Sequence, residues 1–184
     1  MSRQIIVFLL VLFYGRSLKA EDAPFPPPPA NVSSVVTLVS DGEPGEKLVV
    51  RGTVFKEDGK TPYDGFILYL YQTDATGRYN KEDGYWGRPR IRGWIKTDKN
   101  GSYEIRTIKP GSYPGSRNPA HIHIIVKLPG QDPDWIDDFL FEGDPFLDPK
   151  DVKKSLEEKN FSHIVRAEKR DGVLRCRRDI RIGS

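Results

Sequence analysis

Apolar and polar residues alternate through several short runs of this chain, which is the pattern of strands buried on one face. In residues 47–55 the apolar positions are Leu48, Val50 and Val54. Residues 66–71 are apolar on both faces, as expected of a buried strand in the middle of a sheet. Similar patterns predict further strands over residues 93–97, 102–108, 121–128, 166–170 and 173–182.

Turn and cap residues separate these runs. Residues 57–60 are typical of a turn, and the sequence Asp98-Lys-Asn-Gly101 predicts a tight hairpin between two strands. Asp171-Gly172 predicts a second hairpin. One helix is predicted over residues 151–159, with Asp148 as its cap and Pro149 in its first turn.

Short strands with frequent turns predict an all-β fold, and specifically an antiparallel β-sandwich of immunoglobulin or transthyretin type with one short helix. Two stretches, residues 80–92 and 109–120, do not fit as strands and are rich in glycine, proline, arginine and aromatic residues. Ordered loops of this length usually carry function, so we expect them to be active-site loops.

The N-terminus has the pattern of a secretory signal. Arg3 precedes an apolar run over residues 5–14, and the stretch ends at the small residue Ala20. That run is too short to span a bilayer as a helix, so no membrane span is expected. Pro24-Phe-Pro-Pro-Pro-Pro29 is a stiff spacer. The predicted organisation is a signal peptide at 1–20, a proline-rich linker at 21–34 and one folded domain at 35–184, exported to the periplasm or the cell exterior.

Charge and cysteine content narrow the picture further. The chain has 29 basic and 26 acidic side chains, and loss of Arg3, Arg16 and Lys19 with the signal would make the two numbers equal. A balanced charge argues against a nucleic-acid partner. The single cysteine, Cys176, excludes an internal disulfide and is expected to be a buried thiol. The oligomeric state stays open, a homo-oligomer included.

The candidate chemistry begins with His121 and His123. Residues i and i+2 of a strand project from the same face, so an extended His-Ile-His places two imidazoles over one point. The opposite face carries Ile122, Ile124 and Val126 and is expected to be core. This arrangement would hold a metal ion against a packed scaffold.

Two tyrosines beside the loops narrow the choice of metal. Tyr79 directly precedes the first loop, and Tyr113 lies within the second. Either tyrosine alone would be interpreted as a turn or packing residue. A phenol binds a metal only after losing its proton, which a highly charged cation favours most. Two imidazoles and two phenolates therefore indicate non-haem Fe(III) with a position open to water or substrate.

Short segments of the chain, in a fixed order, also carry a family resemblance. They are Gly52-Thr-Val, Tyr71-Gln-Thr-Asp-Ala-Thr-Gly-Arg-Tyr79, Thr97-Asp-Lys-Asn-Gly-Ser-Tyr103, Thr107-Ile-Lys-Pro-Gly-Ser-Tyr-Pro114, Pro119-Ala-His-Ile-His123 and Phe141-Glu-Gly-Asp144. With them the chain resembles the intradiol ring-cleavage dioxygenase family, which includes the protocatechuate and catechol dioxygenases. The resemblance covers about residues 41–182.

The resemblance implies a ligand set and a reaction. It gives Tyr79, Tyr113, His121 and His123 as the ligands of Fe(III). Catechol-type substrates and O2 are the implied partners, and a muconate-type diacid is the implied product. Tyr113 is implied to leave the metal when the substrate binds and to act as a base.

Three positions depart from the family pattern. Asn118 stands where the family commonly has an arginine that stabilises the substrate anion, and Arg117 is its neighbour. Asp138 stands in place of a glutamine, and Gly115 in place of a tryptophan. Arg117, Asn118 and Asp138 remain candidate catalytic or substrate-binding residues.

Residues of the first loop are candidates as well. Tyr85 and Trp86 are candidate substrate contacts because their loop follows Tyr79. The arginines at 88, 90 and 92 are interpreted as a solvated face, with steering of an anionic substrate as the alternative.

Two other functions stay open. Residues 97–105 with Pro110-Gly-Ser-Tyr113 also resemble transthyretin-like domains, which would make the chain a non-catalytic binding module. A cupin-like metal site would need a later glutamate and histidine at strand spacing. His163 fits that role poorly and is interpreted as structural.

Overall fold

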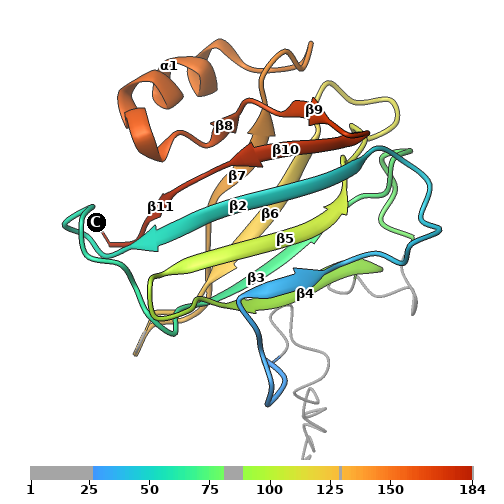
Figure 1. The fold of residues 1–184 in the computed structure, drawn as a ribbon. Helices are drawn as coiled ribbons and strands as arrows, with labels where there is room; N and C mark the ends of the chain where they lie inside the picture. Colours follow the sequence, from blue (N-terminus) through green and yellow to red (C-terminus); the bar gives the residue numbers. More distant parts are fainter. Residues whose placement is uncertain (1–26, 81–88, 129, 184) are drawn as a thin grey trace, which may run out of the picture.

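The computed structural model describes residues 27–80, 89–128 and 130–183, and in them two β-sheets pack face to face as a sandwich (Figure 1). The strands of the first sheet are β1 (Val35–Thr37), β2 (Lys47–Phe55), β5 (Ser102–Ile108), β9 (Glu168–Arg170), β10 (Val173–Arg177) and β11 (Ile180–Arg181). Their order is β1-β5-β2-β10-β9, and β11 continues the pairing of β10 along β2.

The second sheet has the order β4-β3-β6-β7-β8. Its strands are β3 (Ile67–Gln72), β4 (Ile91–Lys96), β6 (His121–Val126), β7 (Asp134–Phe141) and β8 (Ile164–Val165). The pairs β3·β4, β3·β6 and β6·β7 are antiparallel. The predicted sandwich is confirmed, and the structure adds parallel pairs, such as β2·β10 and β7·β8, that alternation alone does not predict.

The core lies between the two sheets and uses one face of each strand. Leu48, Val50 and Val54 of β2 face Leu68, Leu70, Ile122 and Ile124 of the second sheet. Strand β3 is central and buried on both faces, as its sequence predicts. Cys176 is buried in this core, which confirms the expected inert thiol. Burial raises its pKa to about 12.

The predicted helix is present as α1 (Pro149–Glu158), followed by the 3-10 turn η2 (Lys159–Phe161). The Asp148 carboxylate accepts a hydrogen bond from the Lys150 backbone amide at 2.7 Å and caps the helix. Helix α1 lies beside β8 at one margin of the sandwich (Figure 1). No residue of α1 is fully buried, so it covers this margin without entering the core.

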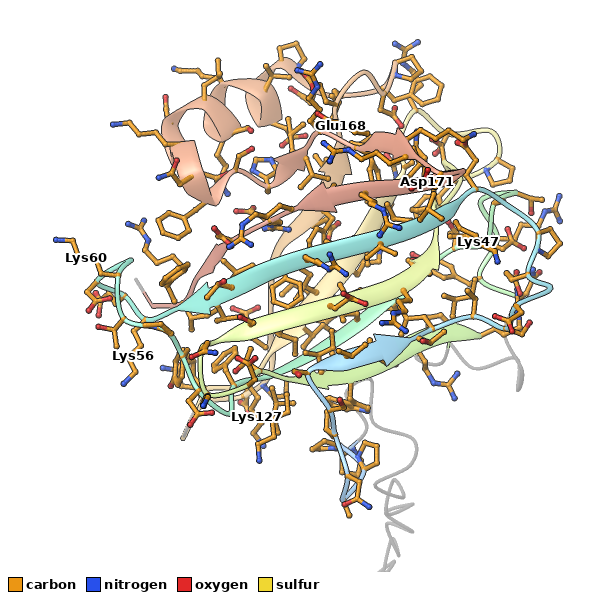
Figure 2. The ribbon with its side chains drawn as sticks, viewed as in Figure 1. Lys47, Lys56, Lys60, Lys127, Glu168 and Asp171 are labelled. Atoms are coloured by element: carbon orange, nitrogen blue, oxygen red, sulfur yellow. The ribbon has the colours of Figure 1, made fainter. Side chains whose placement is uncertain are left out.

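The turn at Asp98-Lys-Asn-Gly101 does not make the predicted hairpin. It joins β4 to β5, and these strands belong to different sheets. Asp98 still forms the turn, because its carboxylate accepts from the amides of Asn100 and Ser102 at 2.8 and 2.9 Å. The second prediction is confirmed, since Asp171 and Gly172 connect the antiparallel strands β9 and β10 (Figure 2).

Strand β7 has no counterpart in the sequence prediction, because its apolar residues do not alternate. Ile136 and Phe139 both face the core although they are three residues apart. A β-bulge explains the spacing: Ile122 pairs with Phe139, Ile124 pairs with Ile136, and His123 lies opposite both Asp137 and Asp138. The two neighbouring aspartates therefore point in different directions.

The predicted strand over 173–182 is interrupted at Arg178 and Asp179. The register with β2 is the same on both sides of the interruption. Within it, the Asp179 carboxylate accepts from the Thr53 amide at 2.8 Å, and the Arg178 amide donates to the Arg51 carbonyl at 2.9 Å. A Cβ on Gly52 would lie 1.7 Å from the Arg178 carbonyl oxygen, so only glycine fits there.

The predicted signal peptide and residues 21–26 of the linker, together with Tyr85, Trp86 and Arg88, lie outside the described residues. Within the described ranges, no helix has both the length and the apolar character needed to cross a membrane.

The close contact at Gly52 predicts a large stability loss on substitution. Gly52→Ala should lower the free energy of unfolding by about 3–5 kcal/mol, because β2 and the β10–β11 connection must separate to admit the methyl group. Gly42→Ala is the matched control, since no atom lies within 4 Å of its added Cβ. Urea unfolding monitored by circular dichroism measures both, and equal midpoints for the two variants would contradict the packing at Gly52.

Candidate metal centre

Four side chains from three segments meet at one end of the second sheet. Tyr79 follows the turn after β3, Tyr113 lies in the loop between β5 and β6, and His121 and His123 begin β6. Lys109, at the start of that loop, donates its backbone amide to Glu46 at 2.8 Å. The centre thus lies near the end of the sandwich where β2 begins, which Lys47 marks in Figure 2.

Five of the six pairs formed by the four polar atoms lie within hydrogen-bond distance. The Tyr79 oxygen is 2.9 Å from His123 Nε2, and the Tyr113 oxygen is 2.9 Å from His121 Nε2 and 3.2 Å from His123 Nε2. The two Nε2 atoms are 3.0 Å apart, and the two phenol oxygens are in hydrogen-bond contact. The sequence prediction that these four residues converge therefore matches their placement in the structure.

The turn that carries Tyr79 is built around Asp74. Its carboxylate accepts from the backbone amides of Thr76 and Arg78 at 2.8 and 3.1 Å, which closes the turn. The side-chain amide of Asn80 also donates to this carboxylate. Tyr79 is therefore held between two residues that bind the same acidic group.

The two tyrosine-bearing segments pack directly on each other through glycines. A Cβ on Gly77 would lie 1.9 Å from the Ser112 carbonyl oxygen, and Gly77 has a φ of +80°. A Cβ on Gly111 would lie 2.5 Å from the Ala75 carbonyl oxygen. The Gly111 amide also donates to the Asp74 carbonyl at 2.9 Å. Close backbone approach is what brings Tyr79 and Tyr113 together.

The outer ring nitrogens of both histidines have partners that fix the tautomer. His121 Nδ1 is 2.7 Å from the Pro119 carbonyl oxygen, and His123 Nδ1 is 3.0 Å from a carboxylate oxygen of Asp138. A carbonyl or carboxylate accepts a proton there, so Nδ1 carries the hydrogen and Nε2 carries a lone pair. Both lone pairs then point into the centre. This is the arrangement that supports metal-binding histidines elsewhere.

In the absence of a metal ion, burial determines the protonation states of the His121 imidazole and the two phenols. It lowers the pKa of His121, which keeps that imidazole neutral at pH 7. Burial raises the pKa of Tyr79, and the bond to Tyr113 raises it further. Burial also raises the pKa of the Tyr113 phenol. Without a cation both phenols are protonated, so a strongly charged ion is needed to make them ligands.

The donor set fits a metal ion. Two Nε2 lone pairs 3.0 Å apart repel each other unless a cation lies between them. Donors about 2.0 Å from one ion and spread at octahedral to tetrahedral angles are separated by about 2.8 to 3.3 Å. The four distances that involve an Nε2 atom, between 2.9 and 3.2 Å, match this range. His121, His123 and Asp138 also form a group whose potential ligand atoms lie within 4.8 Å of one another. Asp138 is bonded to Nδ1, on the far side of the ring from the centre.

An aromatic wall borders the centre. The Tyr71 ring stacks on His123 with centroids 4.4 Å apart, because Tyr71 and His123 are paired residues of β3 and β6. The Trp135 indole donates to the Tyr71 hydroxyl at 3.3 Å and is 54% exposed. His121 is only 8% exposed, whereas Tyr79, Tyr113 and His123 are half-buried and reachable from solvent.

The other predicted residues have varied positions. Asp138 lies against His123, where it orients the imidazole. Asn118 is exposed, and its backbone amide donates to the Ser116 hydroxyl at 3.2 Å. Arg117 is exposed, and its guanidinium lies over the Phe146 ring, 5.7 Å from the centroid.

The arginines near the first loop differ from the predicted solvated face. Arg90 makes a two-pronged salt bridge with Glu43 at 2.6 and 2.7 Å, and the Arg92 guanidinium donates to the Pro89 carbonyl at 2.6 Å. Both arginines therefore brace the loop. His163 is buried and bonded to Glu158 at 2.6 Å, as expected of a structural histidine.

Tyr71 and Trp135 are site residues that the sequence did not single out. The relation of Tyr71 to His123 depends on the register between β3 and β6, which no local pattern reveals. Trp135 lies on the strand whose bulge hides the alternation. The family segment that begins at Tyr71 is the signal that could have drawn attention to that residue.

Comparison with known proteins gives a family match. A family model described as Dioxygenase matches residues 25–177. The catechol 1,2-dioxygenase 2 of Acinetobacter lwoffii is 31% identical over 135 residues, which are 64% of this chain and 48% of that protein. The protocatechuate 3,4-dioxygenase beta chain of Burkholderia cepacia is 33% identical over 120 residues, 59% of this chain and 51% of that protein. The chain thus spans about half the length of these relatives.

Solved structures match over most of the chain. The dioxygenase domain of a dioxygenase carbohydrate-binding protein fusion from Streptomyces sp. SirexAA-E has a TM-score of 0.62 and 26% identity, covering 84% of this chain and 90% of that one. The 3-chlorocatechol 1,2-dioxygenase of Rhodococcus opacus 1CP has a TM-score of 0.62 and 23% identity, covering 80% and 64%. The second match shows the shared fold alone.

The bond between Asp138 and His123 predicts a supporting role in metal binding. Asp138→Ala should weaken the affinity for added Fe(III) by about 10- to 100-fold, because His123 loses the partner that orients its ring and strengthens its lone pair. Asp138→Asn keeps a hydrogen-bond acceptor but loses the charge, so its affinity for Fe(III) should lie between the affinities of the wild type and of Asp138→Ala. Competition against a coloured chelator measures the affinity.

Asp134→Ala is the control on the same strand. Among the residues that the structure describes, the Asp134 carboxylate accepts a hydrogen bond only from the Trp135 backbone amide, at 2.8 Å. If Asp134→Ala and Asp138→Ala bound metal equally well, Asp138 would have no role at the centre.

Proposed function

Because this chain belongs to the intradiol ring-cleavage dioxygenase family, we propose that it is a non-haem Fe(III) enzyme that opens a catechol-type ring with O2 to give a muconate-type diacid. The observation that carries this proposal is the convergence of two phenol oxygens and two Nε2 atoms, in which each oxygen lies 2.9 Å from an Nε2 atom and the two Nε2 atoms are 3.0 Å apart. Tyr79, Tyr113, His121 and His123 would hold the ion.

The bound ion would supply a trivalent Lewis acid that favours the ionised forms of phenols and catechols at neutral pH. Two anionic oxygen donors favour the ferric over the ferrous state, and the imidazoles suit iron. Asp138 and the Pro119 carbonyl would keep both Nε2 lone pairs directed at the site. These supports fix the geometry before substrate arrives.

Tyr113 is the residue that would move a proton. Burial raises the pKa of its phenol, so a Tyr113 phenolate released from the ion would be a strong base beside the substrate hydroxyl. Its loop allows such movement more readily than the segment of Tyr79. Gly115 follows Tyr113 with a φ of +75° and open space around it, whereas Asp74 binds both neighbours of Tyr79.

The substrate ring would lie near Tyr71 and Trp135, which border the open side of the centre. Aromatic faces bind aromatic rings by stacking, so this wall suits a planar catechol. Asn118 and Arg117 do not contact the four donors, so they have no role in the proposed proton transfer.

The alternative of a non-catalytic transthyretin-like module is not favoured. Such a module shares the sandwich but has no need of four converging donors with fixed tautomers. Each of the supports at Asp74, Gly77, Gly111 and Asp138 serves the donor set rather than the core.

Export and assembly are further parts of the proposal. The signal-like pattern over residues 1–20 supports release of a mature chain beginning at Glu21 to the periplasm or the cell exterior. Mass spectrometry of protein recovered outside the cytoplasm tests this, and an intact Met1 would contradict it. A homo-oligomer is compatible with the exposed margins of both sheets.

The ligand set predicts a visible colour. Tyrosinate bound to Fe(III) absorbs visible light by charge transfer, so the iron-loaded protein should be reddish. Tyr113→Phe should shift and weaken the band, because one of two phenolate ligands is lost. Tyr63→Phe is the control, since Tyr63 packs against Phe66 away from the centre. A colourless protein that takes up no iron after ferric loading would overturn the metal assignment.

The reaction is tested separately by oxygen uptake with catechol, protocatechuate, hydroxyquinol and chlorocatechols. We expect turnover on at least one of these, and Tyr113→Phe should lower its kcat by about 100-fold through loss of the base. Tyr63→Phe should keep the wild-type rate. Coloured, iron-loaded protein without uptake on any of them would reject the ring-opening activity and leave the metal centre standing.

A further inference from the structure

A buried arginine without a partner lies on the other side of β7 from the metal centre. Arg178 is 5% exposed, and among the described residues its Nε and Nη1 atoms have no hydrogen-bond partner. No carboxylate of the described chain lies within salt-bridge distance of it. Burial lowers its pKa, but a guanidinium stays charged in proteins.

The position of Arg178 is fixed by its backbone. Its amide donates to the Arg51 carbonyl at 2.9 Å, and its carbonyl accepts from the Tyr103 hydroxyl at 2.6 Å. The close approach of Gly52 leaves no room for this segment to shift. The guanidinium also stacks on the Phe139 ring, 4.6 Å from its centroid. The backbone of Arg178 is therefore held in place, and its guanidinium lies against the Phe139 ring.

Arg178 lines a cavity of about 420 Å³ between α1, β7 and β11. The apolar part of its wall consists of Ile136, Phe161 and Ile180. Arg181 is also at the wall, with its guanidinium 5.5 Å from the centroid of the Phe161 ring. The cavity combines an apolar surface with one buried cation, Arg178, and two exposed ones, Arg181 and Lys154.

The acidic groups of the cavity already have partners or are exposed. Both oxygens of Asp137 accept from the Lys154 ammonium at 2.6 Å. Glu158 accepts from the backbone amide and the ring of His163 at 3.0 and 2.6 Å. Glu157 lies on an exposed position of α1. None of them forms a salt bridge with Arg178, whose charge remains uncompensated by direct contact.

An unpaired buried cation is costly, and the chemistry of the cavity indicates what would relieve that cost. Desolvating a charge without an opposite charge or hydrogen-bond acceptor costs several kcal/mol. A guanidinium fits a carboxylate well, because its planar donors bind two oxygens at once. The apolar wall would cover a hydrocarbon body next to that carboxylate.

We propose that this cavity is a binding site for a small carboxylate with an apolar body, anchored by Arg178. The carboxylate lies at the buried guanidinium, and the hydrocarbon part lies against Ile136, Phe161 and Ile180. The site is separate from the metal centre and does not depend on the proposed ring cleavage.

A divalent cation is the competing occupant. Asp137, Glu158 and His163 offer atoms within 4.8 Å of one another, as metal ligands do. However, Lys154 binds both oxygens of Asp137, and His163 Nδ1 is bonded to Glu158. The fixed charge of Arg178 would repel a second cation in the same space. An anion is therefore favoured.

The experiment uses the iron-loaded protein and two probes of equal chain length, hexanoate and hexanol. Hexanoate at about ten times its dissociation constant should raise the Tm by about 3 °C, whereas hexanol should not. The visible band should not change, which distinguishes this cavity from binding at the iron. Arg178→Leu should remove the hexanoate effect, and Arg178→Lys should weaken binding at least tenfold because the planar fork is lost. Arg175→Leu, an exposed arginine of β10, should behave as wild type.

The outcomes separate the alternatives. If hexanoate and hexanol act alike, or if Arg175→Leu and Arg178→Leu lose the effect equally, the proposal is wrong. A purely structural Arg178 would give no hexanoate shift in the wild type and a lower Tm in Arg178→Leu, because Asp137 and Glu158 would lose a nearby positive charge. Stabilisation by Zn²⁺ or Ca²⁺ that Glu158→Gln removes would instead establish the cation site and overturn the anion site.

Discussion

The hydrogen bond between His123 Nδ1 and the Asp138 carboxylate connects the candidate metal centre to the architecture of the sandwich. It exists because β7 carries a bulge opposite His123, which presents two residues to one. With regular pairing, a single side chain would oppose the histidine and its direction would follow the alternation of the strand. The bulge lets Ile136 and Phe139 stay in the core while Asp138 turns outward to the ring. The bulge in β7 therefore serves both the packing of the core and the hydrogen bond to His123.

The same bulge places Asp137 on another side of the strand. Its carboxylate binds Lys154 of α1 at 2.6 Å and so attaches the helix to the second sheet. Burial opposes ionisation of Asp137, but the bond to Lys154 is strong enough that the net pKa is lowered. Two adjacent aspartates thus serve two different sites, the metal centre through Asp138 and the cavity under α1 through Asp137. A single backbone irregularity gives the fold both features.

The sequence predicted what depends on local alternation and on spacing. Strand β2, strand β5, the capped helix and the pairing of two histidines on one face of β6 follow from residues close together in the chain. The bulge in β7, the crossing of residues 98–101 between sheets and the stacking of Tyr71 on His123 depend on partners far away in sequence. Arg117 illustrates the limit for the site, because the position of its guanidinium over the Phe146 ring depends on a partner that no local pattern reveals.

This chain has Asp138 where the pattern of the family has a glutamine. The difference changes the electrostatics of the centre as well as its hydrogen bonds. Burial is the largest cause of the raised pKa of Tyr113, and the negative charge of Asp138 raises that pKa further. The pKa of Tyr79 is raised by burial, by the hydrogen bond with Tyr113 and by the charge of Asp138. A neutral glutamine could accept a hydrogen bond from His123 but could not raise these pKa values. A raised pKa means that each phenol loses its proton less easily, so a trivalent ion is needed to make it a ligand. It also means that a phenolate released from the ion would be a stronger base. No lysine or arginine of the described residues is bonded to the four donors, so under the proposed function the bound ion would favour ionisation of the substrate and Tyr113 would take up the proton.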